Sequence, residues 1–193
     1  MKWHASARRR ALASLAIAFG LVTLAAQAQA PPVPKSAPEA SLDELRTTAQ
    51  VRMRRDLETF TREQLREIEQ LYQSANKNLR APESRGRLQE LIDKYPASNR
   101  AGCAALYLAQ MSAEGDRETL LREAIAHHAD AWYGDGAQVG PLARAYLASF
   151  YKNQNRHDEA VAMARSIAAG TPDAVDHQGR RIVDVLKGIG LLD

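Results

Sequence analysis

A short segment occurs twice in this 193-residue chain, at an interval that few kinds of fold produce. Residues 107–110 read YLAQ and residues 146–149 read YLAS, thirty-nine residues later. Pro96 and Pro172 each close a helical pattern and lie seventy-six residues apart, which is two intervals of thirty-eight. A helical unit that recurs every ~20–50 residues can bury its apolar face only against neighbouring units. This period therefore predicts an α-solenoid.

The spacing of apolar residues predicts helices throughout the region after residue 40. Steps of three and four place apolar side chains on one helix face, and the first such series is Leu42, Leu45, Ala49, Met53, Leu57 and Phe60. The segments Ser41–Glu44 and Thr61–Gln64 are capping-box patterns, so each predicts a helix start. No stretch alternates β-branched and polar residues for long enough to predict a strand. The fold class is therefore predicted to be all-α.

The first residues have the pattern of a secretory signal peptide. Basic residues at Lys2 and Arg8–Arg10 precede an uncharged run, and Ala26-Gln27-Ala28 supplies small residues for cleavage. The run is shorter than the ~20 residues that a membrane-spanning helix needs. We expect residues 1–28 to be removed, leaving an exported protein, periplasmic or secreted, with no transmembrane segment in its mature chain.

The mature chain is expected to have two parts. Residues 29–40 contain four of the eight prolines, a composition typical of a disordered linker, and residues 41–193 form the helical domain. Removal of the signal peptide changes the net charge. It takes away four of the 26 basic residues and no acidic one, which leaves 22 basic residues against 23 acidic ones. A net charge of −1 gives no support for a nucleic-acid partner, and we exclude that class.

One segment resembles a known repeat family. Residues 141–172 read PLARAYLASFYKNQNRHDEAVAMARSIAAGTP and resemble a tetratricopeptide repeat. The matching positions are the large, small and aromatic residues of the first helix, the small residue of the second and the final proline: Leu147, Ala148, Tyr151, Ala160 and Pro172. Residues 65–96 and 102–131 are similar to the two preceding repeats. The resemblance implies a solenoid of about three helix pairs, preceded by an N-terminal helix and capped by a helix within residues 173–193.

The resemblance also implies a function. In such repeats the first helix of each pair lines a groove that binds an extended protein or peptide partner. The corresponding polar positions in this chain are Gln73, Asn76, Gln110, Ser149 and Lys152. Exported members act in the bacterial cell envelope, so a scaffold that binds a protein there is the expected function.

The glycine-rich stretch between residues 132 and 140 raises the question of a phosphate site. Its glycines run G-x-G-x-x-x-G, no strand is predicted before them, and no Gly-Lys-Ser/Thr follows. We therefore expect an inter-repeat loop, anchored by packing of Trp132 and Tyr133 and continued by Pro141 in the first turn of the next helix. Tyr133 and Asp135 remain candidates for contact with a partner.

No residue pattern predicts catalysis, a metal or a cofactor. Cys103 has small, apolar neighbours, so a packed, inert thiol is expected, although pairing with another chain stays open. The adjacent residues His127 and His128 point about 100° apart on a helix, so we expect a surface or partly packed pair and no metal site. The basic turn Arg52–Arg55 is expected to be solvated. The chain is not predicted to be an enzyme.

Two alternatives to the scaffold remain. Residues 41–79 are compatible with one long helix that forms a coiled coil, which would make the protein an oligomeric structural component of the envelope. The Thr61–Gln64 capping box argues against that helix. A helical enzyme that acts on cell-wall material is the other alternative, and it needs two converging carboxylates or a metal.

Overall fold

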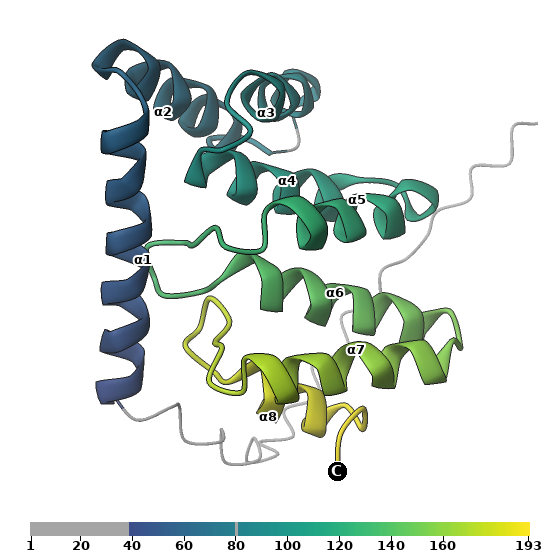
Figure 1. Cartoon of the computed structure of the whole chain (residues 1–193). Helices are drawn as coiled ribbons and strands as arrows, with labels where there is room; N and C mark the ends of the chain where they lie inside the picture. The colour runs from purple at the N-terminus through teal and green to yellow at the C-terminus, as the bar shows by residue number, and fades with distance from the viewer. Residues whose placement is uncertain (1–38, 80) are drawn as a thin grey trace, which may run out of the picture. The chain divides into compact units, whose positions relative to one another are not determined.

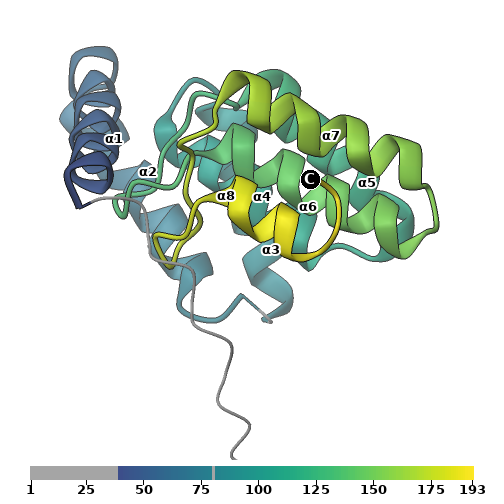
Figure 2. The ribbon, with the colours of Figure 1, turned by 90° about the horizontal axis from the view of Figure 1, so that it is seen from below.

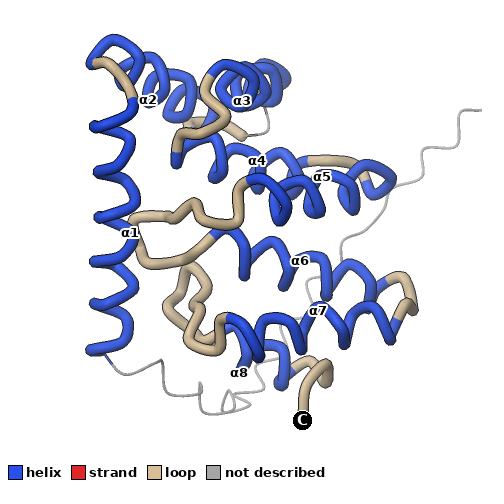
Figure 3. The backbone as a smooth tube through the Cα atoms, in the orientation of Figure 1, coloured by secondary structure: helices blue, strands red, loops and turns tan. Residues whose placement is uncertain are grey.

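Eight helices and no strand make up the part of the chain that the structure, a computed structural model, describes, namely residues 39–193 without residue 80 (Figures 1 and 3). All of these residues belong to one unit, Val33–Asp193. In chain order the helices are α1 (Glu39–Thr59), α2 (Arg62–Asn76), α3 (Pro82–Lys94), α4 (Asn99–Met111), α5 (Glu114–His127), α6 (Val139–Asn153), α7 (His157–Gly170) and α8 (Ile182–Gly188). The all-α prediction is confirmed.

Helices α2 to α7 form three pairs that stack in chain order, and α8 packs on the last pair (Figure 1). The first helices of the pairs, α2, α4 and α6, contact one another in succession, and α8 continues the row. The second helices, α3, α5 and α7, do not contact one another within the described residues. The row of first helices, which we call the A-helix face, is therefore the inner side of the stack, and α8 caps it as expected.

The core contains the residues that the repeat pattern predicted to be packed. Leu147, Ala148 and Tyr151 on α6 are buried, as is Ala160 on α7. Helix α4 is buried on nearly every side. Its residues 101–105 are alanine, glycine and cysteine, which are small enough to let neighbouring elements approach closely. A Cβ on Gly102 would lie 2.3 Å from the Cβ of Ala131. Small residues thus allow the central helix to lie directly against the loop of the following pair.

Two loops between pairs have the same construction, forty-three residues apart. In the α5–α6 loop the carbonyl of Ala131 accepts a hydrogen bond from the N–H of Val139, and in the α7–α8 loop the carbonyl of Ala174 accepts one from Ile182. Each loop turns through a glycine with positive φ, at residues 136 (+96°) and 179 (+75°), where other residues are disfavoured. The predicted inter-repeat loop is confirmed, and its copy in the last pair was not predicted.

Helix α1 lies across the loops that connect the pairs (Figures 1 and 2). Near its start, a side-chain carbon of Leu42 lies 3.4 Å from where a Cβ on Gly179 would stand, in the α7–α8 loop. Further along, the α5–α6 loop runs so close that a Cβ on Gly136 would be 3.3 Å from the backbone nitrogen of Arg46. Near its end, Arg52 donates to the carbonyl of Ala97 in the α3–α4 connection. One helix therefore braces the two connections between pairs and the connection from the last pair to α8.

The structure corrects several predictions about this helix. It begins at Glu39, before Ser41, so the first capping box does not mark its start. Leu57, predicted on the packed face, is 65% exposed. Asp56 is buried in its place, and the side chain of Arg52, expected to be solvated, is only 13% exposed because it pairs with Asp56 and Asp130. The braced loops offer polar backbone groups, so a charged pair packs there better than leucine.

The second capping box is confirmed, and the alternative of one long helix over residues 41–79 is wrong. The side chain of Thr61 accepts from the N–H of Gln64, whose own side chain accepts from the N–H of Thr61. The chain bends between Thr59 and Arg62, so residues 41–79 are not one helix. No helix in the described range 39–193 is long and apolar enough to cross a membrane. The predicted signal peptide and the linker before residue 39 lie outside the described residues.

Candidate functional site

The A-helix face carries two neighbouring hollows on either side of one ridge of α6. The first, of about 250 Å³, lies between α4, the start of α5 and α6. The second, of about 300 Å³, lies between α6, α8 and the α7–α8 loop. Tyr146 and Ser149 line both hollows. This pair of hollows is the candidate site, because it joins three of the stacked first helices along one surface.

Helical spacing explains why α6 contributes to both sides. Leu142 and Tyr146 are four residues apart, as are Ala145 and Ser149, so these four residues share a face of α6. The opposite face, with Leu147 and Tyr151, is buried in the core. Tyr146 stands out on the ridge because 37% of its surface is exposed, which is high for a large apolar residue of this protein. Burial of the rest of the ring, with Asp176 nearby, raises the pKa of its phenol.

A row of aromatic rings runs from one helix pair to the next and ends at His177 in the wall of the second hollow. Tyr72 on α2 stacks on Tyr107 on α4 with 5.9 Å between ring centroids, and Tyr107 meets Tyr133 of the α5–α6 loop at 5.9 Å. The ring of His177 in the α7–α8 loop meets Tyr133 edge-on at 4.6 Å. Arg100 lies over the far end of the row, 4.4 Å from the Tyr72 centroid. The row links α2, α4 and the two loops that follow the second and third pairs.

Hydrogen bonds fix the loop that forms one wall of the second hollow. One carboxylate oxygen of Asp176 accepts from the N–H groups of Gln178 and Arg180, and the other accepts from the Arg180 side chain at 2.8 Å. His177 Nδ1 lies 2.8 Å from a carboxylate oxygen of Asp135 in the neighbouring loop. The wall is therefore rigid, and its negative charges are already paired.

The structure brings two of the sequence-predicted residues together. Gln110 and Ser149 line the same hollow, from α4 and α6 respectively. Gln73 is exposed on α2 and its side-chain amide donates to Glu69 of the same helix, while Asn76 is exposed at the helix end. Lys152 lies outside both hollows, and its ammonium donates to the carbonyl of Ile189.

The loop residues among the candidates are held within the fold. Tyr133 is 6% exposed and its hydroxyl donates to the carbonyl of Cys103, so its predicted anchoring role is confirmed. Asp135 accepts from the N–H of Ala137 and faces His177. Both residues hold the α5–α6 loop in place, and neither lines one of the two hollows.

Sequence reasoning missed the residues that make the second hollow. Tyr146 opens the repeated YLAQ/YLAS segment, but its exposure was not anticipated because aromatic residues in that register are usually packed. His177 and Arg180 belong to the loop copy that was not recognised. A readable signal existed, since Ala131, Gly136 and Val139 recur as Ala174, Gly179 and Ile182 at one constant interval.

The sequence also singled out Cys103 and the adjacent histidines, and the structure places all three. Burial raises the pKa of the Cys103 thiol to about 12, in agreement with the predicted inert thiol. His127 is exposed and His128 half-buried, and burial together with the neighbouring His127 lowers the pKa of His128. Within residues 39–193 without residue 80, no three histidine, cysteine or carboxylate side chains converge in a way that would hold a metal ion.

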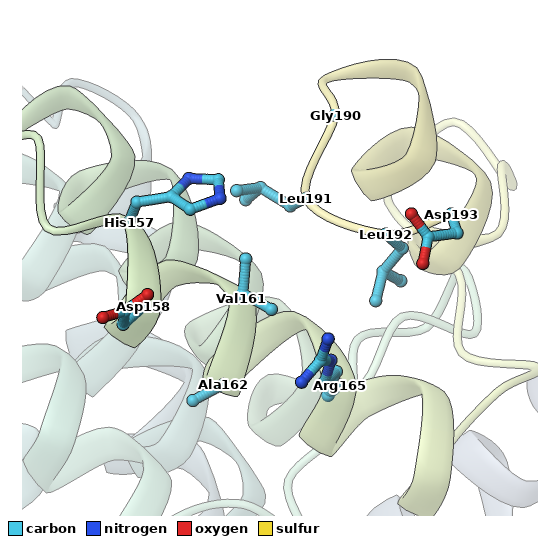
Figure 4. A pocket seen from close by; sticks show the side chains of 9 residues that line it. All are labelled: His157, Asp158, Val161, Ala162, Arg165, Gly190, Leu191, Leu192 and Asp193. Atoms are coloured by element: carbon cyan, nitrogen blue, oxygen red, sulfur yellow. The ribbon is translucent and has the colours of Figure 1, made fainter.

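Two further hollows lie away from the A-helix face. One, of about 420 Å³, lies between α7 and the residues that follow α8, with His157 and Leu191 at one end and Arg165 near Leu192 (Figure 4). The other, of about 570 Å³, lies over α4 between α3 and α5, and its lining includes both histidines of the adjacent pair. Neither hollow joins successive first helices.

Comparison of the chain with protein-family models, curated proteins and solved structures found no match. The stacked helix pairs agree with the fold that the tetratricopeptide resemblance implies. Membership of that family remains a prediction that depends on the residues quoted from the sequence.

Proposed function

We propose that this chain is an exported scaffold that binds an extended segment of a protein partner along its A-helix face. The observation that supports the proposal is the pair of hollows on either side of the Tyr146–Ser149 ridge. Small recesses in succession along a row of stacked helices suit successive side chains of an extended peptide. The location in the cell envelope depends on the predicted signal peptide.

The polar groups of this surface support the same function. Within the described residues, the side chains of Gln110, Tyr146, Ser149 and Asn153 make no hydrogen bond to another residue. Other polar side chains on the described helices are paired, as in the Arg100–Glu69 and Arg181–Asp184 contacts. Accessible amides and hydroxyls with no partner in the protein, beside apolar recesses, are usual features of a surface that binds a ligand.

The test is crosslinking in intact cells. A photo-reactive amino acid at Ser149 or Gln110 is expected to capture a partner, which mass spectrometry then identifies. The matched control places the same group at Arg87, an exposed residue of α3. Capture from both hollow positions but not from the control supports the proposal. Capture equally from all three positions, or from none, argues against it, and fractionation of the same cells tests the predicted export.

A further inference from the structure

The first hollow of the A-helix face contains a positive charge that no described residue neutralises. Arg117, near the start of α5, lines this hollow and is partly buried. Its side chain makes one hydrogen bond, from Nη2 to the carbonyl of Ser112 at 2.9 Å, and forms no ion pair with another described residue. Within residues 39–193 without residue 80, its Nε is the one fully buried side-chain nitrogen or oxygen that has no hydrogen-bond partner.

Other partly buried arginines of this molecule are neutralised. In Arg52, Arg100 and Arg156 a guanidinium nitrogen lies 3.0 Å or less from a carboxylate oxygen. A guanidinium that is partly removed from water loses hydration, and this cost is offset only by other hydrogen-bonding or charged groups. Because arginine donates and never accepts, the ligand that completes the interactions of Arg117 is an anion.

A ligand in the hollow can reach this guanidinium. The Nη1 group has no partner within the described residues and, unlike Nε, is not fully buried. Ser112, which accepts from Nη2, is 3% exposed, so it holds the guanidinium in place and binding needs little reordering of the protein. Leu121 and Phe150 line the same hollow, and apolar surroundings strengthen a charge-assisted hydrogen bond.

The hollow also contains one carboxylate, that of Glu114. It accepts from the side-chain amide of Gln154 and forms no ion pair with Arg117. Glu114 is exposed, so water screens its repulsion of a bound anion more than it screens the attraction of the partly buried Arg117. The amide and hydroxyl side chains of the hollow both donate and accept, so they suit any peptide backbone. The charge of Arg117 is therefore what selects the ligand.

From these observations we infer that Arg117 makes the first hollow a binding site for an acidic side chain, aspartate or glutamate, of the extended partner segment. The inference depends on the proposed function and specifies the chemistry of the partner. The hollow lies between α4 and α6, in the middle of the row α2, α4, α6 and α8. A bound segment continues past it in both directions, which favours a side chain over the terminal carboxylate of a chain. In the second hollow, Arg180 and His177 already contact carboxylates, so a neutral side chain fits there.

Two peptides that differ only in one charge test the inference on the full exported chain. Acetyl-Ser-Leu-Glu-Leu-Ser-amide, titrated into isotope-labelled protein and followed by NMR, is expected to bind about fivefold more tightly than the same peptide with glutamine in place of glutamate. Equal binding of the two peptides, or binding of neither, would overturn the inference. A third peptide has glutamine and a free terminal carboxylate. If it binds more tightly than the glutamate peptide, the site recognises a chain end and the assignment to a side chain is wrong.

Variants connect the preference for glutamate to Arg117. Arg117→Gln removes the charge and keeps a hydrogen-bonding side chain, so it is expected to bind the two amidated peptides equally. Arg117→Lys keeps the charge and is expected to retain part of the preference. Arg87→Gln, on an exposed part of α3, is the control with the same loss of charge and should keep the full preference. If Arg117→Gln and Arg87→Gln prefer glutamate to the same extent, the inference is wrong.

A change of opposite sign in the same hollow gives an independent check. Glu114→Gln removes the one carboxylate beside Arg117 and is expected to strengthen binding of the glutamate peptide about twofold, with no change for the glutamine peptide. Weaker binding of the glutamate peptide would contradict the inference. Circular dichroism of each variant verifies folding.

The two proposals fail in different ways. Crosslinking of a protein from Ser149 together with equal binding of the glutamate and glutamine peptides removes the acidic side-chain site and leaves the scaffold function standing. A glutamate preference that is lost in Arg117→Gln, with no protein captured in cells, supports the chemistry of the site and argues against the envelope partner. Failure of both experiments removes both proposals.

Discussion

The two edges of the helix stack are held together by different chemistry. At the loop edge, where each pair connects to the next helix, buried polar side chains hydrogen-bond to the backbone of the connections and of α4. The side chain of Asn99, 1% exposed, donates to the carbonyl of Trp132 and accepts from its N–H, and the N–H of Asn99 donates to Asp56 of α1. At the turn edge, where the two helices of a pair connect, Glu118 accepts from Arg156, Arg122 and the hydroxyl of Tyr151.

The difference shows what each edge requires. At the loop edge the α5–α6 and α7–α8 connections are long and double back, so their backbone groups need fixed partners, two of which Asn99 supplies to the α5–α6 connection. Helix α1 supplies partners at the shorter α3–α4 connection. The turns at the other edge are short and leave few backbone groups unpaired, so partly exposed ion pairs suffice there. The loop edge also forms a wall of the candidate site through residues 176–180. Changes at that edge should therefore affect both stability and binding.

The largest effect is expected from Gly102→Val at the loop edge. A Cβ alone would come within 2.3 Å of Ala131, so valine forces α4 away from the α5–α6 loop. We expect the free energy of unfolding to fall by about 3 kcal/mol or more, measured by urea denaturation. Gly115→Val is the control, because nothing lies within 4 Å of its Cβ position at the start of α5. Similar losses in both variants would show that the close approach is not what matters.

The next effect is expected from Asn99→Ala. This change removes both side-chain hydrogen bonds to Trp132. It leaves the Trp132 N–H without that partner and its carbonyl with only the weak thiol donor of Cys103, in a partly buried position. A loss of about 2 kcal/mol is expected, little changed by salt because no charge is removed. Asn76→Ala, an exposed position at the end of α2, should lose almost nothing. A strong salt dependence of the Asn99→Ala effect would contradict the division between the two edges.

These positions also show how far sequence reasoning reached. The helices, the pairs and the α5–α6 loop followed from periodicity and capping patterns, because these depend on nearby residues. The contact of Asp56 with Asn99 joins positions 43 apart and was not predicted, since a carboxylate and an amide on separate helices carry no local pattern. In the site, Gln110 and Ser149 were identified through the repeat alignment. Tyr146 was missed because exposure depends on how far the first helices separate.

A smaller effect is expected from Glu118→Gln at the turn edge. Hydrogen bonds from Arg156 and then Tyr151 lower the pKa of Glu118 to about 2, from an ordinary value of 4.5. A lowered pKa in the folded state means that the contribution is complete above pH 4.5 and is lost as the pH falls toward 2. At neutral pH and low salt the variant should lose roughly 1 kcal/mol of stability.

Urea denaturation as a function of pH and salt checks this prediction. The gap in stability between the original chain and Glu118→Gln should narrow as the pH falls from 5 to 2 and as the salt concentration rises. Glu63→Gln is the control, since Glu63 pairs with Arg66 on an exposed part of α2. A gap that stays constant with pH would show that Glu118 stabilises the turn edge by packing instead of by its charge.

The smallest effect has the opposite sign and comes from a residue at neither edge. Gly86 lies in the middle of α3 with nothing within 4 Å of its Cβ position. Gly86→Ala should therefore raise the free energy of unfolding by about 0.5–1 kcal/mol, because alanine loses less backbone entropy in a helix. Gly190→Ala has equally open space but a φ of +72°, so it should destabilise the protein. If both changes shift the free energy of unfolding in the same direction, the open space at the Cβ position determines the effect and the backbone conformation does not. The stability effects predicted for the two edges would then have to be reinterpreted in the same way.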